Sequence, residues 1–233
     1  MYSEAINDGV GWFEMKRRAR PLRKWVFPSK QQAVPGVKRR IKAQTIEFAV
    51  FGDSHVGYGN SLSIFLRVFL PKAVSSGNKR FIIFGGDNTQ AGANHGNNAG
   101  TYYKEFKDTV TSTLGSIPYK ASIGNWEAST RSLFTQYLGA VGGQMNFPGT
   151  QGKVRYVWLD CALGQFTPAS LNLLRNLDDR YFYIIDFHWP LRVQGITVDF
   201  SHVLSAAETS KFFTAIPAKS QREGAGDLHA SWS

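Results

Sequence analysis

Short apolar runs alternate with amphipathic segments between residues 46 and 187. The runs are four to six residues long, the usual length of a buried strand, and we expect strands at residues 46–51, 81–84, 118–123, 154–159 and 181–185. Between them, apolar residues recur every three or four positions, which predicts amphipathic helices at residues 62–69, 103–114 and 168–177. Such alternation of strands and helices is typical of an α/β domain with a largely parallel or mixed sheet.

The first 45 residues follow a different pattern. Prolines at positions 21, 28 and 35 break any continuous helix, so we expect a largely extended arm at residues 1–45 and one domain at residues 46–233. The arm holds eleven Lys or Arg residues and three acidic ones, so it carries eight of the ten net positive charges of the chain. Two interpretations stay open: a solvated leader, or an arm that binds nucleic acid or an anionic surface such as a membrane.

The cysteine content and the hydropathy limit the classes of protein. A single cysteine, Cys161, excludes an internal disulfide framework and a zinc site made of several cysteines. The chain has no apolar run of about 18 residues, so we expect no transmembrane segment. The N-terminus lacks the basic-then-apolar order of a secretory signal. These features favour the cytoplasm, although the sequence does not determine the compartment.

Side chains that can bind metal stand just after four of the expected strands. Asp53 and His55 follow the first strand, and Asp87 follows the second. Asn125 follows the third strand, and His188 follows the last. One Asp-x-His pair alone is more often a turn or a helix cap. Because ligands of open α/β sheets bind beyond the carboxyl ends of the strands, four such ends together predict one shared site.

The residue types narrow the chemistry of this site. Asp, Asn and His without cysteine suit Mn, Fe or Zn, whereas Ca would need more oxygen ligands. Asp87 lies between two groups of ligands and can bridge two divalent or trivalent ions. Two ions about 4 Å apart hold a hydroxide and polarise a phosphoryl group, which is an arrangement that cleaves phosphate esters. We therefore expect a dinuclear centre that hydrolyses phosphate esters with a metal-bound hydroxide as nucleophile.

The four motifs resemble those of the calcineurin-like metallophosphoesterases, a family that includes purple acid phosphatases, protein phosphatases and several nucleases. The motifs, in the family's order, are Gly52-Asp-Ser-His55, Gly86-Asp-Asn88, Gly124-Asn-Trp-Glu127 and His188-Trp-Pro190. The resemblance implies a four-layer α/β/β/α sandwich with two mixed sheets and a dinuclear centre between their ends. It implies that Asp53 and His55 bind the first ion and that Asn125 and His188 bind the second. Asp87 would bridge the two ions, and Asp87 and Asn125 would be catalytic.

The third motif departs from the family at Trp126. The family usually has Gly-Asn-His-Glu, and its histidine stabilises the transition state or protonates the leaving group. Loss of one such group lowers the rate by about 10²- to 10⁴-fold, so we expect a slow enzyme, another acid, or substrates with good leaving groups. Two alternatives remain: a catalytically degenerate domain that binds anions or partners, and a nuclease-type phosphodiesterase that uses the basic arm.

The family's last motif, Gly-His-x-His, has its nearest counterpart at Gly226-Asp-Leu-His229. His229 is thus the expected sixth ligand, and Asp227 replaces a histidine. His202 is the competing candidate, and a tail histidine without a role is the alternative for His229. Because the chain stops four residues after His229, we expect a second sheet that is shortened at its C-terminal edge.

Three further polar residues accompany the motifs. His95 lies in a Gly- and Asn-rich segment after Asp87, where we expect a loop residue or a contact to the substrate phosphate. Glu127 is expected to brace its own turn, and Asp160, at a strand end, to support the site from outside. The substrate and the oligomeric state are left open by the sequence.

Overall fold

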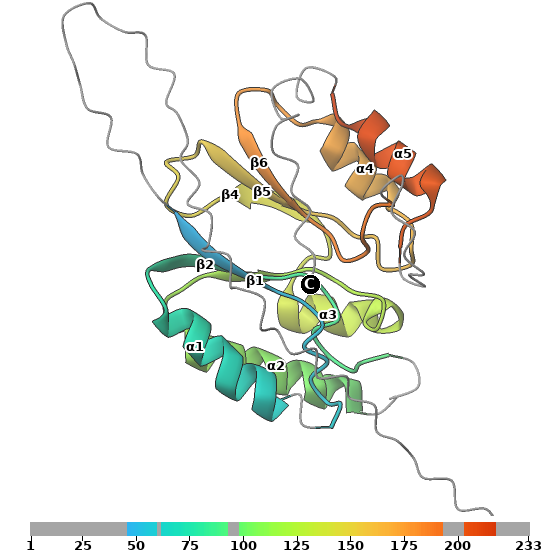
Figure 1. Cartoon of the computed structure of the whole chain (residues 1–233). Coiled ribbons are helices and arrows are strands. Elements are labelled where there is room, and N and C mark those ends of the chain that lie inside the picture. The colour runs from blue at the N-terminus through green and yellow to red at the C-terminus, as the bar shows by residue number, and fades with distance from the viewer. Residues whose placement is uncertain (1–45, 60–61, 93–97, 193–202, 218–233) are drawn as a thin grey trace, which may run out of the picture. The chain divides into compact units, whose positions relative to one another are not determined.

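A computed structural model describes residues 46–59, 62–92, 98–192 and 203–217. In these residues the protein has a mixed α/β structure with two small sheets and five α-helices (Figure 1), which confirms the predicted α/β class. The strands are β1 (Glu47–Phe51), β2 (Lys79–Phe84), β3 (Tyr119–Ala121), β4 (Gly143–Asn146), β5 (Val154–Trp158) and β6 (Phe182–Asp186). The helices are α1 (Leu70–Ser75), α2 (Ala99–Leu114), α3 (Arg131–Leu138), α4 (Pro168–Arg175) and α5 (Ala206–Ala215), with a π-helix η1 (Leu62–Phe69) and a 3-10 turn η3 (Ala128–Thr130).

The first sheet has the strand order β1-β2-β3, and both pairs are parallel. The central strand β2 is flanked on both edges, and its residues Phe81 to Phe84 are buried, which explains their continuous apolar run. In register, Phe51 lies opposite Phe84, and Phe84 lies opposite Ala121. The three strands therefore end at the same edge. Their purely parallel pairing in the described residues differs from the mixed sheet that the family resemblance implies.

The second sheet has the order β4-β5-β6. Strand β4 is antiparallel to β5, whereas β6 is parallel to β5, so this sheet is mixed as expected. In register, Trp158 at the end of β5 lies opposite Asp186 at the end of β6. The chain leaves β6 only two residues before His188.

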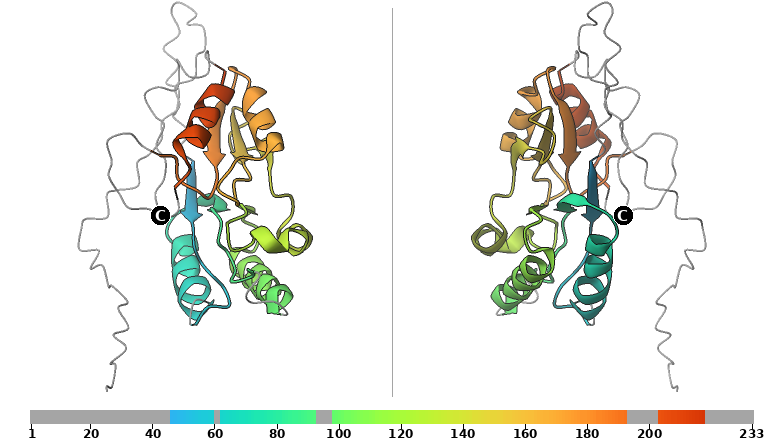
Figure 2. Two further views of the ribbon diagram at one scale, coloured as in Figure 1. Left: turned by 90° about the vertical axis from the view of Figure 1, so that its right-hand side faces the viewer. Right: turned by 90° about the vertical axis from the view of Figure 1, so that its left-hand side faces the viewer.

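Each sheet packs against its own helices. Side chains of β2 and β3 form one buried cluster with η1, α1, α2 and α3, in which Leu66, Leu70, Phe84, Phe106 and Phe134 are nearly inaccessible to solvent. A second cluster joins β5 and the segment after it to α4 and α5. Figure 2 shows α1 and α2 beside the first sheet and α4 and α5 beside the second. Burial of these apolar faces is the main source of stability for elements this short.

Aromatic side chains connect the two sheets. The ring of Phe81 on β2 lies 5.4 Å from the ring of Tyr156 on β5 and 5.2 Å from that of Phe147, which follows β4. Phe48 on β1 also packs edge-on against Phe147 at 5.3 Å. Such edge-to-face contacts are favourable geometries for aromatic pairs. The strand ends of both sheets are thereby brought to a common region.

The helix starts follow capping rules. Thr167 caps α4 by accepting a hydrogen bond from the backbone N–H of Ser170, and Pro168 occupies the first turn. Ser205 caps α5 in the same way, through the N–H of Glu208. Pro71 stands at the start of α1, where its missing N–H costs little, so the helical segment continues to Ser75, beyond the predicted end at residue 69.

Three α-helices and one strand were not predicted from the apolar pattern: α1, α3, α5 and β4. Strand β4 has the composition Gly-Gln-Met-Asn and lies at the edge of its sheet, so its apolar signal is weak. Helix α5 has a broad polar surface, although its Ser-x-x-Glu capping pair is a recognisable start signal. The expected arm at residues 1–45, and the segments that contain His95, His202, Asp227 and His229, lie outside the described residues.

No helix within the described ranges combines the length and the hydropathy that a membrane crossing needs.

Candidate metal centre

The loops after β1 and β2 run side by side and extend the parallel pairing beyond the strands. The backbone N–H of Asp53 donates to the carbonyl of Gly86 at 3.1 Å, and that of His55 donates to the carbonyl of Asp87 at 2.9 Å. Further along, the N–H of Val56 donates to the carbonyl of Asn88 at 3.0 Å. These hydrogen bonds join the backbones of the two loops, and they therefore fix the spacing between the candidate ligands that the loops carry.

Three of the candidate ligands have a positive φ angle, a backbone conformation that residues other than glycine rarely adopt. The φ angles are 51° at Asp53, 42° at His55 and 48° at Asp87. Only one other non-glycine residue in the described part of the chain, Gln151, has a positive φ. Each such residue costs about 1–3 kcal/mol and persists only where its surroundings enforce it. Local strain is thus concentrated at the ends of β1 and β2, as is common at functional sites.

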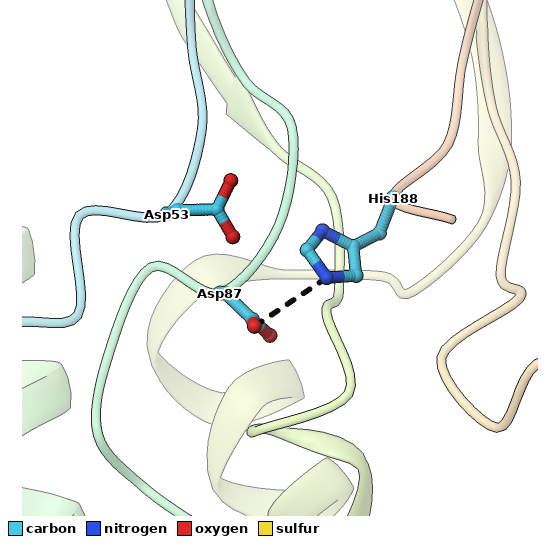
Figure 3. A group of neighbouring side chains, drawn as sticks. All are labelled: Asp53, Asp87 and His188. Carbon is cyan, nitrogen blue, oxygen red and sulfur yellow. Dashed lines mark ion pairs between the residues drawn. The ribbon is translucent and has the colours of Figure 1, made fainter. Parts of the chain in front are cut away.

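The side chains of Asp53, Asp87 and His188 converge (Figure 3). Each offers one potential ligand atom, and these atoms all lie within 4.8 Å of one another. His55 is adjacent, because its Nε2 lies 3.9 Å from Oδ1 of Asp53 and 3.9 Å from Oδ2 of Asp87. Asn125, which follows β3, reaches the same point with its Oδ1 2.9 Å from Nε2 of His188. The structure therefore brings together all five of the predicted site residues that it describes.

His188 is held by groups on the first sheet. Its Nδ1 lies 3.1 Å from the carbonyl oxygen of Gly85, and its Nε2 lies 3.4 Å from Oδ2 of Asp87. Burial lowers the pKa of His188, but the hydrogen bond and charge of Asp87, with the charge of Asp53, outweigh it and raise the pKa to about 8. Nδ1 faces the carbonyl of Gly85, which can only accept a hydrogen bond, and Nε2 lies 2.9 Å from Oδ1 of Asn125. When Nε2 carries no proton, its lone pair is available to coordinate a cation.

Asp87 lies at the centre of the group and is only 3% exposed. Its Oδ1 accepts a hydrogen bond of 2.9 Å from the backbone N–H of Trp126, which leaves Oδ2 directed at the two histidines. Glycines make room for this arrangement. A Cβ on Gly86, whose φ is 109°, would lie 2.5 Å from Nδ1 of His188, and a Cβ on Gly124 would overlap the backbone nitrogen and Oδ1 of Asp87.

Glu127 braces the turn that carries Asn125, as the sequence predicts. It is fully buried, and its two carboxylate oxygens accept hydrogen bonds from the backbone N–H groups of Thr89, at 2.9 Å, and Gly124, at 2.8 Å. Burial raises the pKa of Glu127 to about 7, and the charge of Asp87 adds to this effect. Glu127 therefore ties the loop after β2 to the loop after β3.

Loss of this brace should lower stability. We expect Glu127→Ala to reduce the free energy of unfolding by about 3–5 kcal/mol, because two buried N–H groups lose their acceptor. Glu127→Gln keeps one acceptor and should cost about 1–3 kcal/mol. The exposed Glu105→Gln on α2 is the matched control and should change the value by less than about 0.5 kcal/mol. Urea unfolding measures all three variants, and equal values for Glu127→Ala and the control would contradict the role.

The carboxylate of Asp186 lies beside the candidate metal centre, although the sequence analysis did not name Asp186 as part of it. Oδ2 of Asp186, at the end of β6, accepts hydrogen bonds from Ser122 at 2.5 Å and from Tyr156 at 2.8 Å. Burial raises the pKa of Asp186, while the two hydroxyl groups act in the opposite direction. Asp160, expected to support the site, instead forms a two-fold ion pair with Arg131 at the start of α3.

The donor set fits a metal ion. Two carboxylates, two imidazoles and an amide oxygen are the ligands that Mn, Fe and Zn accept, and no thiolate is among them. The glycines at positions 86 and 124 leave the space that the converging side chains need. These residues can therefore hold a divalent cation.

Comparison with known proteins gives a fold but no sequence family. The sequence matches no protein-family profile, and no curated protein resembles it significantly. Its structure is similar to that of a solved protein, a dimetal phosphatase from Danio rerio, with a TM-score of 0.50 and 13% sequence identity. The similarity covers 72% of this chain and 76% of the other. The chain therefore shares the fold of that solved protein.

Proposed function

We propose that the protein is a metal-dependent hydrolase of phosphate esters with a dinuclear metal centre in a four-layer α/β/β/α sandwich. The observation that carries the proposal is the convergence of Asp53, Asp87 and His188 from three separate strand ends to within 4.8 Å. Two of these three residues hold strained backbone conformations, which a site without a function would not be expected to retain.

Each residue has a distinct role in this proposal. Asp53 and His55 would hold one ion, Asn125 and His188 would hold the other, and Asp87 would be shared between them. When bound, the ions supply an activated water as nucleophile and neutralise charge on the phosphoryl oxygens. The backbone N–H of Trp126 keeps Oδ1 of Asp87 in place, and the carbonyl of Gly85 fixes the orientation of the His188 ring. His229 stays a proposed sixth ligand outside the described residues.

Hydrolysis of generic esters tests the proposal. Full-length protein, freed of metal and then supplied with Mn²⁺, should hydrolyse p-nitrophenyl phosphate or bis(p-nitrophenyl) phosphate, and a chelator should abolish the reaction. Less than one equivalent of bound metal, with no hydrolysis in added Mn²⁺, would contradict the proposal. Bound metal and bound phosphate without turnover would favour the degenerate, anion-binding alternative.

Trp126 should limit the range of substrates. Its ring lies edge-on to that of His55, with centroids 5.6 Å apart, and it packs close to Gly92. Trp126→His places an acid where the family has one, so we expect turnover of phenyl phosphate, which has a poor leaving group, to rise by about 10- to 100-fold. Turnover of p-nitrophenyl phosphate should rise less. Trp126→Phe adds no acid and is the control; equal gains in both variants would show that ring size is the cause.

A second candidate function, a nuclease-type phosphodiesterase, is favoured by the charge of residues 1–45. The arm carries eight of the ten net positive charges. Deletion of residues 1–45 should weaken binding of single-stranded DNA or RNA and flatten the dependence of log Kd on log salt, because fewer phosphates are neutralised. Fluorescence anisotropy between about 50 and 200 mM salt measures both effects. Unchanged affinity and slope would leave the arm without this role.

A further inference from the structure

Asp186 connects the second sheet to the first beside the candidate metal centre. It ends β6 and precedes His188 by two residues, so in an extended chain both side chains point to the same side. A Cβ on Gly85 would lie 3.7 Å from Oδ1 of Asp186, and the carbonyl of the same glycine lies 3.1 Å from Nδ1 of His188. Asp186 and His188 thus both lie against Gly85 of the first sheet.

The two hydrogen bonds of Asp186 join different parts of the molecule. Tyr156 belongs to β5, the neighbour of β6 in the same sheet, so the 2.8 Å bond from its hydroxyl stays within the second sheet. Ser122 follows β3, so the 2.5 Å bond from its hydroxyl crosses from the first sheet to the second.

Ser122 is itself firmly fixed in the first sheet. It is fully buried, its N–H donates to the carbonyl of Phe84 at 2.7 Å, and its own carbonyl accepts a bond of 2.9 Å from the side chain of Asn88. Because these bonds fix Ser122, its hydroxyl group cannot follow the Asp186 carboxylate if that carboxylate shifts. The bond between them therefore holds Asp186 in a fixed position relative to the first sheet.

His188 depends on this alignment more than the other candidate ligands do. Asp53, His55, Asp87 and Asn125 all follow strands of the first sheet, whereas in the described residues His188 alone comes from the second. Figure 3 shows its ring entering the group from the opposite side to Asp53 and Asp87. Functional groups must be held to within about 0.5 Å, so a small shift between the sheets would move Nε2 of His188 out of reach of a shared ion.

We propose that Asp186 is a positioning residue that, through its bond with Ser122, fixes the His188 imidazole against the first sheet and thereby sets the affinity of the centre for divalent cations. The inference rests on the proposed function only in taking His188 as a metal ligand. It assigns Asp186 no contact with substrate.

A pair of matched hydroxyl deletions tests this role. Ser122→Ala and Tyr156→Phe each remove one donor to the same carboxylate oxygen, but only the first removes the bond between the sheets. The first readout is the Nδ1–H resonance of His188 in the ¹⁵N NMR spectrum of full-length protein without metal, assigned through its loss in His188→Gln. We expect a protected resonance in the wild type and in Tyr156→Phe, and its broadening or loss in Ser122→Ala.

The second readout is the Kd for Mn²⁺ alone, measured by calorimetry. Residues that orient metal ligands typically contribute 10- to 100-fold in affinity, so we expect Ser122→Ala to raise the Kd about 10-fold and Tyr156→Phe less than about 3-fold. If Ser122→Ala does not fold, Ser122→Cys replaces it, because cysteine is similar in size to serine and is a weaker hydrogen-bond donor. Ser122→Cys should change both readouts in the direction expected for Ser122→Ala.

The outcomes separate this inference from the proposed function. Equal effects of Ser122→Ala and Tyr156→Phe, or no effect of Ser122→Ala on either readout, would overturn the positioning role while Mn²⁺ binding by the wild type stood. If the wild type bound no Mn²⁺ but Ser122→Ala alone lost the His188 resonance, the alignment of His188 by Asp186 would stand and the proposed function would fail.

Discussion

Asp87→Asn should strongly weaken metal binding and hydrolysis while the fold is retained. The asparagine can keep an oxygen at the position that accepts the N–H of Trp126, so the turn loses little. An amide nitrogen then replaces Oδ2 of Asp87, and this nitrogen cannot bind a cation. Oδ2 lies 3.4 Å from Nε2 of His188 and 3.9 Å from Nε2 of His55. We expect the Kd for Mn²⁺ to rise more than about 100-fold, beyond the effect of an orienting residue.

Hydrolysis by the same variant should fall by on the order of a thousandfold, comparable with the loss of a preorganised electrostatic group. Asp108→Asn is the matched control, because Asp108 is exposed on α2 and pairs with Lys104 of the same helix. The control should bind Mn²⁺ and hydrolyse ester like the wild type. Circular dichroism confirms that both variants are folded. An Asp87→Asn protein with wild-type metal content and turnover would remove Asp87 from the proposed centre.

Gly124→Ala should both destabilise the fold and weaken metal binding. The added methyl group would overlap the backbone nitrogen and Oδ1 of Asp87, and a backbone atom cannot move aside as a flexible side chain can. Overpacking in a tight core costs about 1–3 kcal/mol and occasionally more, and we expect at least about 3 kcal/mol here. Where the protein still folds, the displaced Asp87 should lower Mn²⁺ affinity, measured by calorimetry beside urea unfolding.

Gly85→Ala is the control for this prediction. Gly85 also lies at the site, but a Cβ there would meet the carbonyl of Phe51 at 3.5 Å and Asp186 at 3.7 Å, which are ordinary van der Waals contacts. The substitution should therefore cost less than about 1 kcal/mol. If Gly124→Ala were as stable as Gly85→Ala and bound metal equally well, the close approach of Gly124 to Asp87 would not be a constraint on the site.

The sequence predicts those features that depend on local pattern. Apolar runs identify β2 and β5, which are largely buried, and β6, whose residues are mostly half-buried. The residues after β1, β2, β3 and β6 identify the candidate ligands. The parallel sheet then brings Asp53, Asp87 and Asn125 to one edge. His188 joins them because β6 is parallel to β5 and the two sheets pack through Phe81 and Tyr156.

Other features depend on contacts between distant segments and have little local signal. The positive φ angles of Asp53, His55 and Asp87 occur where backbone bonds join two loops that are far apart in the sequence. The bond between Ser122 and Asp186 joins residues 64 positions apart, and neither residue type is unusual at a strand end. Strand β4 lies at a sheet edge with few apolar residues, so packing decides its structure.

Diffraction from crystals grown with Mn²⁺, recorded at the manganese absorption edge, tests the central claim most directly. The account predicts two anomalous peaks about 4 Å apart, one contacted by Asp53 and His55, the other by Asn125 and His188, with Asp87 between them. The same map would identify whether His229 or His202 completes the ligand set. Crystals that bind Mn²⁺ elsewhere, or show no peak at these five side chains, would contradict a metal centre at the ends of β1, β2, β3 and β6.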